Sequence, residues 1–124
     1  MSSIAVVTGA AGDIGRAIAL RLADSHDIVV LVDIDVAAAE KAARDLGTAE
    51  RFVALGCDVT SEVELAALAS KIAGFGLVHT LVNNAGVFLG KPFVDITQED
   101  FDNNMGVNVA GFFHITQRVA TEML

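Results

Sequence analysis

Hydrophobic residues gather in four short runs, and each run is followed by a stretch in which apolar positions recur with helical spacing. Short apolar runs bounded by glycine or polar residues are typical of buried strands. The strands are expected at Ile4–Val7, Ile28–Val32, Phe52–Gly56 and Thr80–Asn83, the last with a start one residue earlier as an alternative. Repeated strand–helix units with short connections predict an α/β protein with a parallel sheet and right-handed crossovers.

Helix signals follow each of these strands. Ser61 and Glu64 have the spacing of a capping box, and Thr97 is a candidate N-cap residue. The expected helices are Ile14–Ala23, Val36–Leu46 with a stop at Gly47, Ser61 to near Gly74, Thr97–Asn103 and Val109–Leu124. The only proline, Pro92, lies in an irregular stretch between the last strand and the fourth helix.

The segment Thr8-Gly9-Ala10-Ala11-Gly12-Asp13-Ile14-Gly15 connects the first strand to the first helix. A buried strand, a glycine-rich turn and a helix form the phosphate-binding corner of a dinucleotide-binding unit. Unpaired N–H groups and the positive end of the helix dipole suit a pyrophosphate, and glycine lets the backbone approach it. This corner favours a Rossmann-type sheet with flanking helices, and it places Gly9, Asp13, Ile14 and Gly15 beside the cofactor.

An acidic residue ends the second strand, where a dinucleotide site needs a carboxylate to accept hydrogen bonds from ribose hydroxyls. That residue is Asp33, and no lysine or arginine follows it at positions 34–36. A carboxylate would repel a 2′-phosphate, so NAD is favoured over NADP. Two other interpretations remain open: Asp33 begins the next helix, or Asp35 takes the ribose role.

Further motifs resemble the short-chain dehydrogenase/reductase family. They are Asn83-Asn84-Ala85-Gly86 after the fourth strand, Asp58-Val59 after the third, and Asn108 within Val107-Asn108-Val109-Ala110-Gly111. The resemblance covers nearly the whole chain. It implies that Asp58 and Val59 flank the adenine ring, that Asn84, Ala85 and Gly86 contact the cofactor, and that Asn108 belongs to the catalytic Asn–Ser–Tyr–Lys set. The implied reaction is hydride exchange between nicotinamide and a small alcohol or carbonyl substrate.

Structural roles compete with several of these functional ones. The Asn83-Asn84 pair also suits a strand-end turn, because asparagine tolerates left-handed backbone geometry. Asp58 could cap the next helix, and Asn108 could be a buried, hydrogen-bonded amide. The spacing Gly-x-x-Gly-x-x-Gly is that of the family's extended branch of epimerases and dehydratases, whereas the shorter branch would carry glycine at Asp13. Asp13 would either repel the pyrophosphate or cap the first helix. The remaining motifs favour the shorter, dehydrogenase branch.

Composition narrows the function classes further. The net charge of −8 and the lack of a basic cluster argue against nucleic acid as a partner. No apolar run approaches membrane-spanning length, and the single cysteine, Cys57, indicates a reducing compartment, so a cytoplasmic location is expected. The three histidines are too scattered to form a metal site.

The 124 residues contain no tyrosine. The family resemblance implies a Tyr-x-x-x-Lys pair and a serine beyond the asparagine helix, so we expect a truncated domain, an incomplete doubly wound fold that is inactive alone. An apolar final helix and an open sheet edge predict a homo-oligomer formed through that helix. Alternatives are a complete non-catalytic nucleotide-binding or regulatory module, and a split enzyme whose other half supplies tyrosine and lysine.

Overall fold

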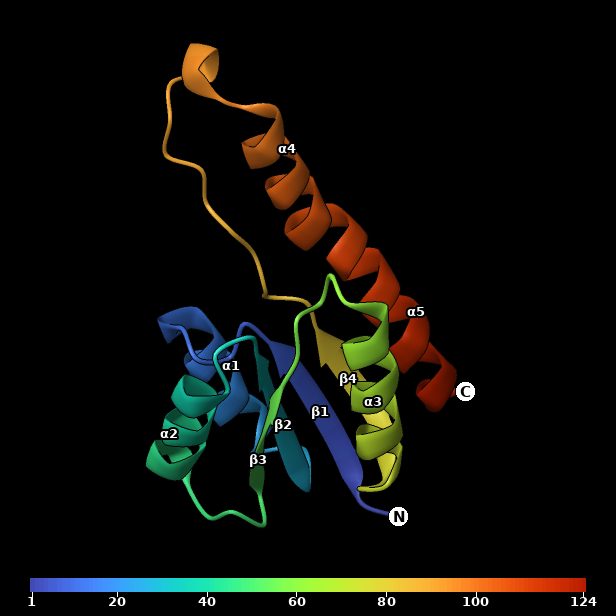
Figure 1. Cartoon of the computed structure of the whole chain (residues 1–124). Helices are drawn as coiled ribbons and strands as arrows, with labels where there is room; N and C mark the ends of the chain where they lie inside the picture. Colours follow the sequence, from blue (N-terminus) through green and yellow to red (C-terminus); the bar gives the residue numbers. More distant parts are fainter.

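Four parallel strands form one sheet at the centre of the molecule, and helices cover both of its faces (Figure 1). The computed structural model describes all 124 residues. The strands are β1 (Ser3–Thr8), β2 (Ile28–Asp33), β3 (Phe52–Gly56) and β4 (Leu77–Val82), in the order β3-β2-β1-β4. The helices between them are α1 (Asp13–Leu22), α2 (Val36–Leu46) and α3 (Glu62–Ala73). This arrangement confirms the predicted α/β class with a parallel sheet.

Alternate residues of the central strands enter two separate hydrophobic cores. Ile4 and Val6 of β1 pack into a cluster with side chains of α3 and of the last helix, whereas Ala5 and Val7 pack into a cluster with alanines of α1 and α2. Both faces of β1 are therefore fully buried, as expected for a parallel sheet covered by helices on each side. The small alanines let α1 and α2 lie close to the sheet.

The fourth strand begins earlier than the sequence pattern predicted. It covers Leu77–Val82 rather than Thr80–Asn83, because Leu77 and Val78 pair with the start of β1. The register shifts between Ile4 and Ala5, which leaves His79 as an extra residue in the ladder. The polar, exposed His79 interrupts the apolar run and hides the true start of the strand.

The C-terminal helices form one continuous rod, which corrects the prediction of two helices separated by a break. A short 3₁₀ turn, η1 (Phe93–Asp95), precedes α4 (Gln98–Met105), a π-helical segment η2 (Gly106–Gly111) and α5 (Phe112–Met123). Gly106 has right-handed helical angles and therefore continues the helix instead of ending it. α5 packs on the sheet, whereas α4 extends beyond its carboxyl edge (Figure 1). None of the helices combines the length and apolar character needed to cross a membrane.

Both predicted N-cap residues, Ser61 and Thr97, cap their helices, but the capping box predicted at Ser61 is incomplete. Thr97 caps α4 and exchanges hydrogen bonds with Asp100 in a full capping box. Ser61 caps α3 by accepting from the Glu64 amide, but the Glu64 carboxylate accepts from the amide of Asp58 instead of from Ser61. The predicted Ser61–Glu64 box is therefore only half formed, since the amide of Ser61 donates to the Asp58 carbonyl.

Candidate dinucleotide site

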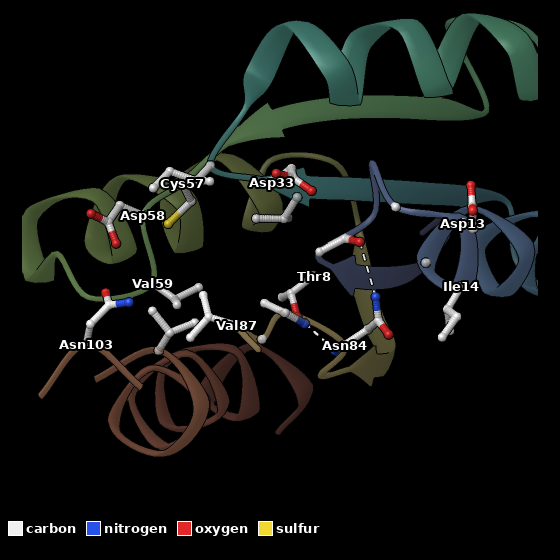
Figure 2. A pocket seen from close by; sticks show the side chains of 18 residues that line it. Thr8, Asp13, Ile14, Asp33, Cys57, Asp58, Val59, Asn84, Val87 and Asn103 are labelled. Carbon is white, nitrogen blue, oxygen red and sulfur yellow. Dashed lines mark hydrogen bonds between the residues drawn. The ribbon is translucent and has the colours of Figure 1, made fainter. Parts of the chain in front are cut away.

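A cleft of about 710 Å³ opens at the carboxyl ends of the four strands (Figure 2). All ten residues predicted to contact a cofactor line it: Gly9, Asp13, Ile14, Gly15, Asp33, Asp58, Val59, Asn84, Ala85 and Gly86. Eight residues that were not predicted as cofactor contacts complete the lining: Thr8, Gly12, Val32, Ile34, Cys57, Val87, Asn103 and Val107. Parallel topology explains this convergence, because it brings the loops after successive strands to the same edge of the sheet.

Glycine is required at two positions of the turn after β1. Gly9 has a φ of +62°, a left-handed conformation that other residues rarely adopt. At Gly15, a Cβ atom would lie 2.5 Å from the Gly9 carbonyl oxygen and 2.7 Å from the Cα of Ala10. At Gly12 it would meet nothing nearer than 3.7 Å. The geometry of the turn therefore demands Gly9 and Gly15 but tolerates a side chain at Gly12.

The first turn of α1 faces the cleft with an open end. Gly12 is the N-cap residue and supplies no side-chain acceptor, so the first-turn amides have no capping partner. Asp13 does not cap the helix, which rules out the structural role considered for it. Its fully exposed carboxylate lies 3.8 Å from the Arg16 guanidinium. Asp13 thus contributes negative charge at the rim of the cleft, while the amides behind it remain available to an anion.

A buried hydroxyl fastens the loop after β4 to the end of β1. Thr8 Oγ1 accepts hydrogen bonds from the amides of Asn84 at 3.0 Å and Ala85 at 2.9 Å. The Asn84 side chain in turn donates from Nδ2 to the Gly9 carbonyl oxygen at 3.1 Å, one of the bonds drawn in Figure 2. No residue other than glycine has a positive φ, so the asparagines do not adopt left-handed geometry. Thr8 and Asn84 therefore fix the loop after β4 against the turn after β1, and both segments form walls of the cleft.

Asp33 projects from the end of β2 and is held by two backbone amides. Its Oδ2 accepts from the amide of Ala11 and its Oδ1 from that of Asp35, both at 3.0 Å. Asp35 does not line the cleft, because its side chain caps α2 by accepting from the Ala38 amide at 3.1 Å. Asp33, and not Asp35, is therefore the carboxylate at the end of β2 that lines the cleft, and its bond to the Ala11 amide fixes its orientation against the glycine-rich turn.

The segment after β3 forms the far end of the cleft. The Thr60 hydroxyl at 2.6 Å and the Thr60 amide at 2.9 Å both donate to Asp58 Oδ1, and these bonds lower the pKa of the Asp58 carboxyl. Asp58 therefore does not cap α3, a role that Ser61 performs. Burial, aided by the nearby Glu64 and Asp58 charges, raises the pKa of the Cys57 thiol to about 11, so Cys57 is a protonated packing residue rather than a nucleophile.

Asn108 lies in the π-helical segment and does not line the cleft. Its side chain spans the backbone of Val87: Oδ1 accepts from the Val87 amide at 2.8 Å, and Nδ2 donates to the Val87 carbonyl at 3.0 Å. Asn83 makes a second link by donating to Thr116 Oγ1 at 2.9 Å. The hydrogen bonds considered as the structural role of Asn108 are thus present, but the side chain is half-buried rather than buried, and it joins the helix to the loop after β4.

Comparisons with known proteins agree with this architecture. A family model described as short chain dehydrogenase matches residues 3–124. The 7alpha-hydroxysteroid dehydrogenase of Escherichia coli is 42% identical over 121 residues, which cover 96% of this chain and 47% of that protein. The D-threitol dehydrogenase of Mycolicibacterium smegmatis is 36% identical, with 98% of this chain and 47% of that protein covered. The chain therefore spans about half the length of the curated relatives it matches.

Solved structures show the same fold. A short-chain dehydrogenase/reductase from Brucella melitensis, described as a glucose/ribitol dehydrogenase, superimposes with a TM-score of 0.91 at 30% identity, over 98% of this chain and 52% of that one. The Escherichia coli hydroxysteroid dehydrogenase gives 0.85 at 42% identity, with the same coverage. Fold and cleft define an α/β protein of the Rossmann type. The chain belongs to the short-chain dehydrogenase/reductase family of oxidoreductases.

Proposed function

We propose that this chain is the cofactor-binding part of an NAD-dependent dehydrogenase. The observation that carries the proposal is the convergence of all ten predicted contact residues on one cleft beside the open N-terminus of α1. When bound, the nicotinamide supplies or accepts the hydride, and the protein supplies binding and orientation. The first-turn amides bind the pyrophosphate, Asp33 accepts from ribose hydroxyls, and Val59 packs on the adenine.

The charge of the cleft supports NAD rather than NADP. Three aspartates line it, Asp13, Asp33 and Asp58, and no lysine, arginine or histidine does. An additional 2′-phosphate would meet the Asp33 carboxylate without a basic side chain to balance it. The amides that already hold Asp33 would also keep it from turning away.

A small alcohol or its carbonyl counterpart is the proposed substrate class. The relatives named above are dehydrogenases of a hydroxysteroid and of a polyol. The chain contains no tyrosine, so a general acid/base of the tyrosine type must come from residues outside these 124. Asn108, proposed as a member of the catalytic set, sits in a π-helical segment, a feature frequent at functional sites.

Calorimetric titration with NAD and NADP tests the proposal. We expect the chain to bind NAD about fivefold or more tightly than NADP, because repulsion between two charges 4 Å apart is worth roughly 1–4 kcal/mol at surface-like dielectrics. Asp33→Asn keeps the shape of the side chain and a carbonyl acceptor for Ala11, and it should reduce the preference severalfold. An unchanged preference would contradict the role of Asp33, and absence of binding by both nucleotides would contradict the proposed function.

The proposed homo-oligomer forms through the last helices. A stripe of large apolar side chains is exposed along them: Phe101, Met105, Val109, Phe112 and Phe113. Apolar surface of this extent is unusual on a monomer. Sedimentation velocity is expected to show a dimer or larger species at micromolar concentration, and Phe113→Glu should shift it toward monomer. A wild-type chain that sediments as a monomer would contradict the proposal.

A further inference from the structure

Asn103 lines the cleft from α4, a helix that none of the sequence motifs had linked to the cofactor site. Its side chain is exposed, and that side chain makes no hydrogen bond within the protein. The other asparagine of the cleft, Asn84, already donates to the Gly9 carbonyl. Asn103 is therefore the cleft amide whose donors and acceptor are both free for a ligand.

The continuous helix determines where Asn103 lies. At Gly111 the backbone comes so close to the loop after β3 that a Cβ atom would lie 2.6 Å from Val59 Cγ2. At Gly106 it would lie 3.8 Å from the methyl group of Thr60. Asn103 is one helical turn before Gly106, and it projects toward the end of the cleft that carries Asp58 and Val59 (Figure 2).

The chemistry at this end of the cleft is complementary to a purine edge. Asp58 uses Oδ1 for Thr60 and makes no bond within the protein through Oδ2, and its lowered pKa keeps it ionised and acceptor-only near neutral pH. A side-chain amide offers a donor and an acceptor side by side, which match the exocyclic amine of adenine and its neighbouring ring nitrogen. Val59 and Val107 also line the cleft and add apolar surface to it.

We propose that Asn103 is an adenine-recognition residue, which pairs with the hydrogen-bonding edge of the ring across the cleft from Asp58. The inference rests on the proposed function, since it assigns one contact within the same dinucleotide site. It extends that function by adding one residue of α4, which would recognise adenine, to the predicted contact residues that follow the strands.

The test compares ADP-ribose, which contains adenine, with nicotinamide mononucleotide, which does not. Asn103→Ala is expected to weaken ADP-ribose binding about fivefold, the value of roughly one hydrogen bond, and to leave binding of the mononucleotide unchanged. Alanine is a strong helix former and Asn103 is exposed, so α4 is expected to persist, which circular dichroism can verify. Asn104→Ala is the matched control, because this neighbouring asparagine does not line the cleft.

Each outcome separates the two proposals. If the wild-type chain does not bind ADP-ribose, the proposed function fails and the inference fails with it. If the wild-type chain binds and Asn103→Ala binds equally well, only the inference is overturned. An equal loss in the Asn103→Ala and Asn104→Ala variants, or an equal loss for both ligands, would also overturn it, because the effect would then be on the helix. The expected pattern is a loss confined to Asn103→Ala and to ADP-ribose.

Discussion

Replacing Gly15 by valine is expected to abolish dinucleotide binding and to lower the free energy of unfolding by about 3 kcal/mol or more. The new Cβ would lie 2.5 Å from the Gly9 carbonyl oxygen and 2.7 Å from Ala10 Cα. Both are backbone atoms, so no rotamer change can relieve the overlap, and the turn itself must move. That movement would displace the first-turn amides of α1 from the cleft. Urea denaturation and titration with ADP-ribose measure the two effects.

Gly12→Ala in the same turn provides the control. The added methyl group would lie 3.7 Å from its nearest neighbour, and Gly12 has a φ of −78°, which alanine adopts readily. Its stability is expected to be unchanged or raised by about 0.4–1 kcal/mol, because alanine restricts the unfolded chain. If Gly15→Val unfolded at the same urea concentration as Gly12→Ala, the close approach at Gly15 would not constrain the turn.

This contrast also shows why the glycine spacing alone misleads. The pattern Gly-x-x-Gly-x-x-Gly suggests three equivalent glycines, yet the fold needs only Gly9 and Gly15. Gly12 occupies a position that accepts a side chain, so its presence does not indicate the extended branch of the family. The match of the short chain dehydrogenase model to residues 3–124 agrees with this interpretation.

The residues that line the cleft were largely predictable because they follow strands. Apolar runs located the carboxyl ends of β1, β2 and β3, and parallel topology requires those ends to meet. Asn103 could not be found in this way, since it enters from a helix whose path depends on Gly106. Glycine in a sequence suggests a helix break, but tertiary packing keeps Gly106 helical and carries the rod past the cleft. Asn108 was singled out by resemblance, whereas its bonds to Val87 depend on contacts between distant segments.

Thr8 is another residue whose role only the structure shows. A threonine at the end of an apolar strand is compatible with simple strand propensity, which its β-branched side chain satisfies. In the fold Thr8 is buried, with 1% of its surface exposed, and its hydroxyl accepts hydrogen bonds from the amides of Asn84 and Ala85. A polar group at the buried end of a strand beside a glycine-rich turn is the signal that could have identified it.

Thr8→Val is accordingly expected to destabilise the fold by about 2–5 kcal/mol, although valine has nearly the same shape. The substitution leaves two partly buried amides without their acceptor, and each fully buried donor left unsatisfied costs about 1–3 kcal/mol, a cost that partial exposure reduces. The loop that carries Asn84 would no longer be fixed to β1, so ADP-ribose affinity should fall together with stability. Thermal or urea unfolding and the same titration measure these losses.

Thr8→Ser separates the hydroxyl from the bulk of the side chain. Serine keeps the acceptor for both amides and removes one methyl group, which costs about 1 kcal/mol by itself. We therefore expect Thr8→Ser to bind ADP-ribose nearly as the wild type does, although it fills the core less well than Thr8→Val. Equal destabilisation in both variants would mean that loss of the hydroxyl costs no more than loss of one methyl group, about 1 kcal/mol, and would contradict the larger effect expected for Thr8→Val. The reverse order of stability, with valine above serine, would show that the two amides find other acceptors and that Thr8 does not position the site.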